Sequence, residues 1–387
     1  MSRGTDGTKL VPQRIKEARE YRLLSVTELA DKIGKSRQAV SQFENGTITP
    51  TPDILSKIAS TTGFPLQYFF KEERIQNVSS SEIPIFRGST VKTKGLKRSY
   101  EIASMWSDEI RNYLKNYLIL IDVNLPKDIE FDFTCEVDVT SRIEKIADIL
   151  RDFWSLGKGP IRDIVGILEN NGFIVSKIPH KVKEVEAFSQ WYEKIPYIFY
   201  EGNRDTSVSY TFSVCHELGH LILHQSLTEN EISNVSLYKA IENQANIFAG
   251  AFLLPAETFG NEYLTSNLDS YIAIKKKWNV SLGAMIIRAR NLDIIDKQQL
   301  TYLFRQLSAR GYRKHEPYDD EMKFEGPSII YSSVKMIFDN KIVNMQDFID
   351  TIALPKDELI AVCSFPDYFI EQHLTSPRNG PHLYVIK

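Results

Sequence analysis

The stretch FSVCHELGHLILH, residues 212–224, contains three of the seven histidines of this 387-residue chain. His216 and His220 are four residues apart, so on a helix they lie about 40° apart around the axis and about 6 Å apart along it, where both imidazoles can reach one metal ion. Glu217 is rotated by about 100° from His216, which places its carboxylate where it can accept a proton from a metal-bound water. The arrangement H-E-x-x-H therefore predicts a metal-dependent hydrolase with Glu217 as its catalytic base.

The residues around the histidines predict a buried helix. Its apolar positions are Phe212, Val214, Leu218, Leu221, Ile222 and Leu223. Gly219, between the two histidines, leaves room for another backbone to pack closely. The alternative is a core helix whose histidines are satisfied by local hydrogen bonds. We disfavour it because two buried imidazoles and a buried glutamate without a metal are costly to desolvate.

A second helix is predicted for residues 240–254, AIENQANIFAGAFLL, because apolar residues recur at helical spacing and Pro255 ends the run. Glu242 is the candidate third ligand, and the alternative for it is a solvated helical glutamate. Asn246, four residues later on the same face, suits a hydrogen bond that holds a ligand histidine. His224 is the other candidate ligand, but it lies about 40° further round the first helix, which favours a structural or pocket-wall role.

The two segments HELGHLILH and ENQANIFAGAFLLP resemble the ImmA/IrrE family of bacterial zinc metallopeptidases. The resemblance implies a Zn²⁺ cofactor whose ligands are His216, His220 and Glu242. It implies Glu217 as the base and a specific protein substrate, typically a transcriptional repressor. The chain departs from the family pattern at Gln244, where an acidic residue is common, and at Cys215, where alanine is usual. Neither position carries the mechanism.

Strands are predicted at residues 173–175, 186–192 and 197–200, just before the metal-binding helix. An exposed edge strand beside such a helix would hold an extended peptide substrate through main-chain hydrogen bonds. The sequence does not decide which residue stabilises the oxyanion. The candidates are Tyr192, Tyr210 and His224.

The composition, with 42% hydrophobic and 25% charged residues, is typical of a soluble globular protein with two or three domains. The chain has neither an N-terminal signal region nor a run of about 18 apolar residues, so we expect a cytoplasmic protein with no membrane association. The three cysteines, Cys135, Cys215 and Cys363, are scattered and are expected to be reduced thiols.

The N-terminal part predicts five short helices. Residues 1–72 carry eleven Lys and Arg against eight Asp and Glu, a net charge of +3 in a chain whose total is −3, which fits a nucleic-acid-binding module on an acidic body. Ser25 with Glu28 has the pattern of a capping box, Ser36 that of the next N-cap, and Gly34 ends the helix between them. Two short helices joined by a tight turn that contains glycine indicate a helix-turn-helix.

The run SRQAVSQFENG resembles the Xre family of phage-repressor-type helix-turn-helix proteins. The resemblance places the start of the third helix in the major groove of a double-stranded DNA operator. Arginine suits guanine and glutamine suits adenine. The expected DNA contacts are therefore Arg37, Gln38, Ser41 and Gln42, and the expected core residues are Ala30, Ile33, Val40, Phe43, Leu55 and Ile58. The alternative is a small helical interaction module without DNA contact.

The predicted fold is mainly α with a small β-sheet, an α+β protein. Its parts are a disordered tail (1–10), an all-α helix-turn-helix domain (11–72), a linker (73–100) with one extended piece, IPIF, a connecting helix (101–140), a zincin-like metallopeptidase domain (141–296) and a helical C-terminal domain (297–387). An aromatic stripe on the connecting helix is typical of a core or of a homodimer seam. The C-terminal domain could serve as a sensor, a docking unit or a dimerisation unit, and the sequence leaves these open.

These patterns together predict a DNA-binding transcriptional regulator whose zinc peptidase domain hydrolyses a specific protein. The competing hypothesis is a transcription factor or an antitoxin-like regulator whose zinc domain is structural or sensory and does not cleave. The linker is the long exposed segment in which self-cleavage would release the DNA-binding domain. A tethered substrate has an effective concentration of roughly millimolar, so an active peptidase would destroy its own regulator unless access to the linker were gated. Nothing in residues 73–100 distinguishes a cleavage sequence from an ordinary flexible linker. We therefore expect the chain to remain full length and to cleave a separate protein.

Overall fold

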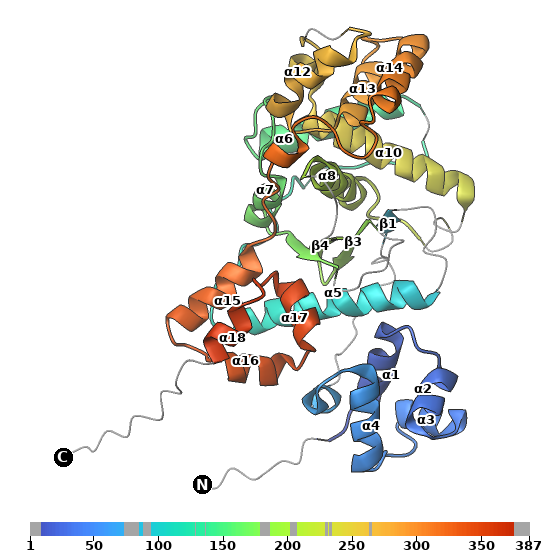
Figure 1. The fold of residues 1–387 in the computed structure, drawn as a ribbon, viewed down its shortest axis with the longest axis vertical. Coiled ribbons are helices and arrows are strands. Elements are labelled where there is room, and N and C mark those ends of the chain that lie inside the picture. Colours follow the sequence, from blue (N-terminus) through green and yellow to red (C-terminus); the bar gives the residue numbers. More distant parts are fainter. Residues whose placement is uncertain are drawn as a thin grey trace, which may run out of the picture. The chain divides into compact units, whose positions relative to one another are not determined.

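A computed structural model describes residues 9–72, 85–87, 94–127, 129–135, 137–178, 186–201, 207–228, 231, 234–262 and 265–374. These residues are mainly helical and contain one four-stranded sheet (Figure 1), which confirms the predicted α+β class. None of their helices is both long enough and apolar enough to span a bilayer. The predicted tail lies mostly outside the described residues, and so does most of the predicted linker.

The chain folds into two compact units. Unit 1 consists of Met1–Gln76, Lys92–Ile119 and Ser328–Lys387, and unit 2 consists of Asn77–Val91 and Leu120–Pro327. Each unit is therefore assembled from segments that are distant in the sequence. The compact units do not follow the predicted domain boundaries, because long-range packing, which local patterns do not reveal, joins the two ends of the chain.

The N-terminal bundle of unit 1 has the predicted helices. They are α1 (Pro12–Tyr21), α2 (Val26–Ile33), α3 (Arg37–Glu44), α4 (Pro52–Thr62) and the 3-10 helix η1 (Leu66–Phe70). Ser25 and Glu28 form the predicted capping box, and the Ser36 hydroxyl accepts a hydrogen bond from the Ala39 amide. Gly34 has a φ of 68°, the left-handed conformation that the turn between α2 and α3 requires. All six predicted core residues are buried.

A buried ion pair links α1 to the end of α3. Arg19 donates from Nε to Glu44 Oε1 at 2.5 Å and from Nη2 to Glu44 Oε2 at 2.9 Å. Such two-pronged pairs fix geometry as well as charge. The pair therefore sets the orientation of α3 relative to α1.

Helix α5 (Lys94–Leu114) runs through the core of unit 1 and packs against α1, α15 and α17. The Trp106 ring is fully buried and contacts the rings of Tyr21, Phe64 and Tyr68. This part of the aromatic stripe therefore forms core. The predicted boundaries were wrong: α5 begins within the predicted linker and ends at Leu114, well before residue 140, because its apolar face is matched to the core of unit 1.

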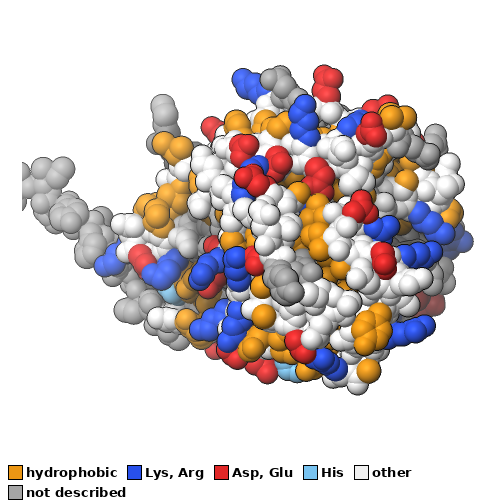
Figure 2. All heavy atoms as spheres, turned by 90° about the horizontal axis from the view of Figure 1, so that it is seen from above, with side chains coloured by type: hydrophobic (Ala, Val, Ile, Leu, Met, Phe, Trp, Pro, Cys, Tyr) orange, Lys and Arg blue, Asp and Glu red, His pale blue; other side chains and the backbone are white. Residues whose placement is uncertain are grey.

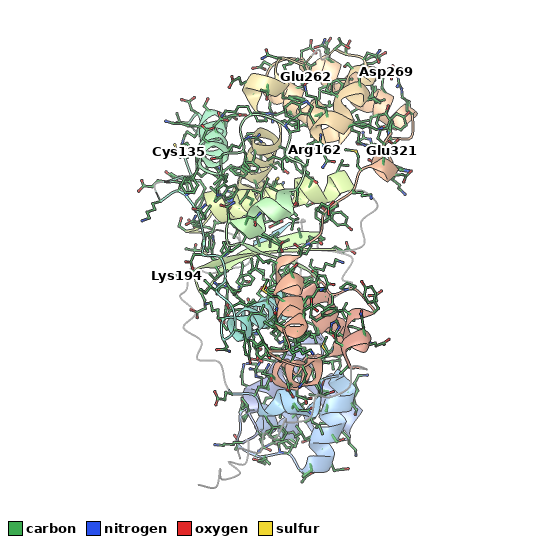
Figure 3. All side chains as sticks on the ribbon, turned by 90° about the vertical axis from the view of Figure 1, so that its left-hand side faces the viewer. Cys135, Arg162, Lys194, Glu262, Asp269 and Glu321 are labelled. Atoms are coloured by element: carbon green, nitrogen blue, oxygen red, sulfur yellow. The ribbon has the colours of Figure 1, made fainter. Side chains whose placement is uncertain are left out.

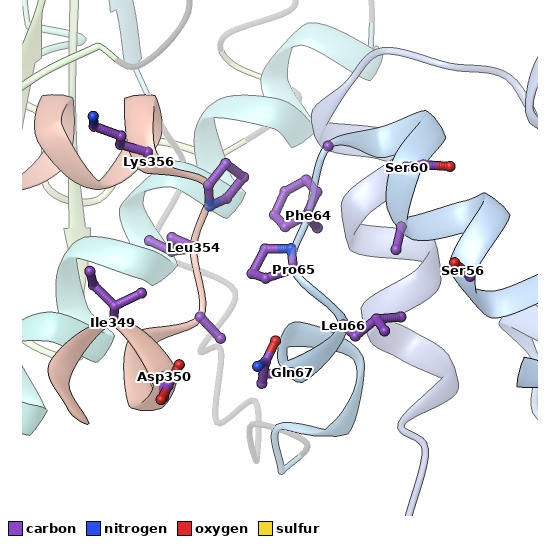
Figure 4. Close-up of a pocket in the computed structure, with 14 residues that line it drawn as sticks. Ser56, Ser60, Phe64, Pro65, Leu66, Gln67, Ile349, Asp350, Leu354 and Lys356 are labelled. Atoms are coloured by element: carbon purple, nitrogen blue, oxygen red, sulfur yellow. The ribbon is translucent and has the colours of Figure 1, made fainter. Parts of the chain in front are cut away.

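The C-terminal helices of unit 1 are α15 (Ile329–Asp339), α16 (Met345–Ile352), α17 (Lys356–Cys363) and α18 (Phe369–Leu374). Phe338, Phe348, Phe365 and Phe369 pack together among them. With α4 and η1 these helices line a cavity of about 530 Å³, in which Phe64, Pro65 and Leu66 face Ile349 and Leu354 (Figure 4). The predicted C-terminal domain is thus divided, because α14 (Lys297–Ala309) belongs to unit 2.

The sheet of unit 2 has the strand order β1 (Ile85–Arg87), β3 (Ala187–Tyr192), β4 (Ile195–Tyr200) and β2 (Ile174–Lys177). β3 and β4 form an antiparallel hairpin, and β2 is parallel to β4. Glu193 and Lys194, with φ values of 49° and 63°, form the two-residue turn, and Lys194 lies at the outer end of the hairpin (Figure 3). β1 pairs antiparallel with β3, so β3 is not an edge strand of this sheet.

The helices of unit 2 are α6 (Val139–Phe153), α7 (Ile164–Asn170), α8 (Ser207–Leu223), α10 (Val235–Leu253), α11 (Ala256–Phe259), α12 (Leu268–Trp278), α13 (Leu282–Asn291) and α14, with the 3-10 helix η2 (Asp319–Glu321). They include two, α7 and α8, that contact this sheet. Figure 1 shows α8 between the sheet and α10, and α8 contacts both. On the face drawn in Figure 2, Lys and Arg side chains are interspersed with Asp and Glu side chains.

The entry into α6 differs from the prediction. The run SRIE, residues 141–144, predicts a helix with Ser141 as its N-cap. Helix α6 instead begins at Val139 after Asp138, whose φ is 48°, so Ser141 lies inside the helix. Residues 120–138, predicted as part of a connecting helix, instead belong to unit 2 without forming a helix in their described part. Phe133 from this segment packs with Leu227 and Ile241 near the end of α8 and the start of α10.

Candidate metal centre

The candidate metal centre lies where α8 and α10 pack closely. A Cβ atom on Gly219 would approach the Ala245 carbonyl oxygen to 3.3 Å and Phe248 Cδ1 to 3.1 Å. Both are tighter than ordinary van der Waals contacts, so glycine is required for this separation. The sequence prediction that Gly219 and the small residues of α10 allow close packing is confirmed. The result is that side chains from the two helices meet at one point.

Three donor groups meet at this point: His216, His220 and Glu242. The two histidine Nε2 atoms are 3.0 Å apart, and Glu242 oxygens lie 3.5 Å from His216 Nε2 and 3.3 Å from His220 Nε2. A tetrahedral zinc ion with bonds of about 2.0–2.2 Å separates its ligand atoms by roughly 3.4 Å. The residues therefore fit a zinc ion, with Glu242 on the side closest to solvent, where its side chain is 20% exposed.

The carboxylate of Glu242 is held in its charged form. Burial raises the pKa of Glu242, but hydrogen bonds with His216 and His220 outweigh burial and hold this pKa well below its usual range. An anionic carboxylate is the form that binds a cation.

Glu217 is fully buried beside the three donors. Its Oε2 accepts a hydrogen bond of 2.7 Å from the hydroxyl of Ser189 on β3. The carboxylate is therefore oriented from the sheet side. Ser189 was not predicted as a site residue, because the sequence gives no sign that this strand position faces α8.

The Nδ1 atom of His216 lies 3.0 Å from Asn246 Oδ1, as predicted. An amide oxygen only accepts hydrogen bonds, so His216 Nδ1 carries the proton. The lone pair of His216 is then on Nε2, which faces the other donors. Asn246 thereby selects the tautomer that can bind a metal.

His220 is oriented by a longer chain of hydrogen bonds. Gln244 Nε2 donates to the Phe133 carbonyl at 2.9 Å, so Gln244 Oε1 is the acceptor for His224 Nε2, also at 2.9 Å. Burial, followed by the proximity of His220, lowers the pKa of His224 well below its usual range, so its ring is neutral. Its unprotonated Nδ1 then accepts from His220 Nδ1 at 3.0 Å, which leaves the lone pair of His220 on Nε2.

This chain of contacts resolves two questions that the sequence left open. His224 is directed toward Gln244 and His220, and it does not belong to the group of donors that could hold a metal. Gln244, the departure from the family pattern, is its partner. We therefore continue to prefer a structural or pocket-wall role for His224 over a role as a metal ligand.

Tyr238 is a residue near the site that sequence reasoning missed. It lies one helical turn before Glu242 on α10, and its hydroxyl hydrogen-bonds to Glu242. Burial, the charge of Glu242 and the charge of Glu217 raise the pKa of Tyr238, so it remains a protonated donor. The spacing of four residues between Tyr238 and Glu242 was the available signal. By contrast, Tyr210 packs against Tyr200 and Phe324.

A cavity of about 560 Å³ lies in unit 2. Asn246, which bonds His216, lines it together with Phe212 of α8, Ala284 and Ile287 of α13, and Arg313. The three donors and Glu217 are not among its lining residues, so Asn246 is the link between this cavity and the candidate metal centre. Cys215 is fully buried, and burial raises the pKa of its thiol, so it provides no thiolate ligand.

In unit 1, the predicted DNA-contacting residues lie together at the start of α3. Arg37, Gln38 and Ser41 are exposed and Gln42 is half-buried. Val40 and Phe43 face the core instead. This separation of polar and apolar faces is what a recognition helix requires.

The fold and the site define two classes of module: a helix-turn-helix bundle, and a pair of packed helices that carries the H-E-x-x-H sequence and a group of candidate metal ligands. Comparison with family models agrees with both. Residues 15–69 match the helix-turn-helix family, and residues 169–290 match the M78 peptidase family, described as the IrrE N-terminal-like domain. No curated protein matches the chain. The chain thus combines an Xre-like helix-turn-helix DNA-binding domain with an ImmA/IrrE-like peptidase-family domain.

Proposed function

We propose that the protein is a transcriptional regulator whose unit 2 is a zinc-dependent peptidase. The observation that carries the proposal is the convergence of His216, His220 and Glu242 to within 4.8 Å of one another, with Glu217 buried beside them. The match to the M78 peptidase family supports the same chemistry.

The roles of the residues follow from their contacts. Zinc held by the three donors would act as a Lewis acid and lower the pKa of a coordinated water. Glu217, oriented by Ser189, accepts a proton and later delivers it to the leaving amine. Tyr238 hydrogen-bonds to Glu242 and would hold this carboxylate in place as a ligand.

The proposed substrate is a separate protein, a transcriptional repressor in keeping with the family resemblance. The helix-turn-helix domain binds a double-stranded DNA operator through Arg37, Gln38, Ser41 and Gln42. Cleavage of the repressor relieves repression at genes that the regulator controls.

The test combines metal analysis with a base-inactivated variant. Purified wild type and Glu217→Gln are both expected to contain one zinc per chain, because the base is not a ligand. In cells, a candidate repressor is expected to disappear with wild type and to persist with Glu217→Gln, as measured by immunoblot. Equal loss of the repressor with both proteins would reject the peptidase. Persistence with both, for every repressor whose genes respond to the regulator, would favour a structural or sensory zinc domain.

A further inference from the structure

Strand β1 occupies the edge of β3. The opposed residues are Ile85 and Ser189, Phe86 and Phe188, and Arg87 and Ala187. The other edge of β3 is paired with β4 along all six residues. β3 therefore has one edge on which an extended chain can add, and residues 85–87 occupy it.

This edge lies beside the candidate base. Ser189, in the middle of β3, donates to Glu217 Oε2 at 2.7 Å. Two residues later the Trp191 indole N–H donates to the Leu221 carbonyl at 3.1 Å. β3 therefore runs along the same part of α8 that carries Glu217 and His220. A chain added to its edge lies one strand spacing, about 4.8 Å, from the strand that bonds Glu217.

An exposed strand edge recognises a particular class of ligand. It binds an extended backbone whose N–H and C=O groups continue the hydrogen-bond ladder, whereas side chains add specificity. A folded protein presents no such backbone unless a segment is unpaired. The ligand of this edge is therefore an extended segment of polypeptide, and β1 already has that form.

We propose, on the basis of the proposed peptidase function, that the β3 edge binds the substrate as an antiparallel strand and that residues 85–87 are its resting occupant. A substrate must displace them before it reaches the metal centre. β1 pairs with only the first three residues of β3, whereas a longer strand adds further hydrogen bonds to the ladder, each of which favours binding. A longer substrate strand can therefore compete, while the tether keeps β1 at roughly millimolar effective concentration.

The course of the chain connects this occupancy to the DNA-binding unit. Residues up to Gln76 and from Lys92 onward belong to unit 1, whereas the segment between them, which contains β1, belongs to unit 2. The chain leaves the DNA-binding unit, adds a strand to the peptidase sheet and returns. β1 is therefore connected covalently to unit 1 on both of its sides.

The experiment measures binding and not cleavage. The full-length chain with Glu217→Gln is combined with Phe86→Pro or with Arg87→Pro. Successive residues of a strand direct their N–H groups to opposite sides, so one proline removes a donor directed at β3 and the other serves as its matched control. The probe is a fluorescent peptide with the sequence of residues 82–90, EIPIFRGST. We expect one of the two variants to bind it roughly tenfold more tightly than the parent, and amide exchange at residues 187–189 to accelerate by a similar factor.

A reversible disulfide between β1 and β3, here called the lock, tests the same proposal without a proline substitution. Arg87 and Ala187 are opposed, so the pair Arg87→Cys and Ala187→Cys is expected to form a disulfide that abolishes peptide binding until it is reduced. Each single cysteine variant is the control. Unchanged peptide affinity and exchange in both proline variants, with peptide binding unaffected by the lock, would overturn the proposal.

Two further outcomes distinguish a failure of this proposal from a failure of the proposed peptidase function. Zinc-dependent cleavage of the wild-type chain within residues 82–90, absent from Glu217→Gln, would overturn the role of resting occupant, because the segment would then be a substrate. Peptide binding that behaves as expected in a protein that cleaves no repressor would support the edge site and reject only the peptidase.

Discussion

Gln244 accepts a hydrogen bond from His224, with 2.9 Å between Oε1 and Nε2, and this contact determines which nitrogen of His220 carries a proton. The amide of Gln244 has one orientation available, because its nitrogen donates to the Phe133 carbonyl. A glutamate would present two acceptors and lose that donor. The departure from the family pattern therefore has a structural role: it connects the proposed metal ligand to the segment before α6.

The first prediction concerns this chain of hydrogen bonds. Gln244→Leu removes the acceptor of His224, so the tautomer of His220 is no longer fixed, and zinc affinity is expected to fall by about 10- to 100-fold. Gln244→Glu retains the acceptor and is expected to keep the affinity within a few-fold of wild type. Zinc affinity is measured by competition with a chromophoric chelator. NMR of the imidazole nitrogens of the metal-free protein gives the His220 tautomer. Equal affinity in Gln244→Leu and wild type would contradict the argument.

The second prediction concerns the proposed ligands. His216→Ala and His220→Ala are expected to lose zinc, Glu242→Ala to bind it more weakly, and Glu217→Gln to retain it. Metal content by mass spectrometry after dialysis against a weak chelator distinguishes these outcomes. If Glu242→Ala binds zinc as tightly as wild type, the third ligand is misassigned, and His224 becomes the residue to test next.

The third prediction concerns the close approach of α8 and α10. Gly219→Ala adds a Cβ atom 3.3 Å from the Ala245 carbonyl oxygen, so α10 must shift and carry Glu242 away from the histidines. Overpacking of about 1–3 kcal/mol exceeds or cancels the gain of up to about 1 kcal/mol in helix propensity. We expect weaker zinc binding and an unchanged or lower melting temperature.

Gly250→Ala is the matched control for this substitution. It lies on α10, but its added Cβ atom would meet nothing closer than Arg288 Cδ at 3.7 Å, an ordinary contact. It is therefore expected to raise the melting temperature slightly and to leave zinc affinity unchanged. Equal zinc affinities for Gly219→Ala, Gly250→Ala and wild type would show that the helix separation does not set the metal geometry.

The local features of this protein could be predicted from its sequence. The spacing of His216 and His220 predicted their convergence, and the caps at Ser25 and Ser36 predicted the bundle helices. The position of Asn246 four residues after Glu242 suited it to hydrogen-bond a histidine, and its Oδ1 atom lies 3.0 Å from His216 Nδ1. In each case the residues involved lie within one helix, one turn or two adjoining helices. The helical spacing of apolar residues and the capping residues therefore predict these features.

The sequence was not sufficient where partners are distant. Nothing near Ser189 indicates that it bonds Glu217, 28 residues later, and nothing near Phe133 indicates that its carbonyl supports Gln244, 111 residues later. The division of residues 297–387 between the two units also depends on packing partners that are distant in the sequence. Helical patterns were visible for residues 329–338 and 345–352, which correspond to α15 and α16. Such patterns do not indicate which part of the chain packs against each helix.

The last prediction separates DNA recognition from metal binding. Arg37→Ala and Gln42→Ala each remove a base-edge contact at the start of α3 and are expected to weaken specific operator binding by about 1–3 kcal/mol. Lys57→Ala removes the same charge as Arg37→Ala, but from α4, where Lys57 is exposed and lies 3.9 Å from Asp53. Its effect is expected to be small and similar for specific and nonspecific DNA, because it changes only the overall field. Binding is measured by fluorescence anisotropy with the operator and with a scrambled duplex at one fixed salt concentration, and zinc content is expected to be the same in all three variants. If Lys57→Ala lowered operator affinity as much as Arg37→Ala, the loss would reflect charge alone and the assignment of α3 as the recognition helix would fail.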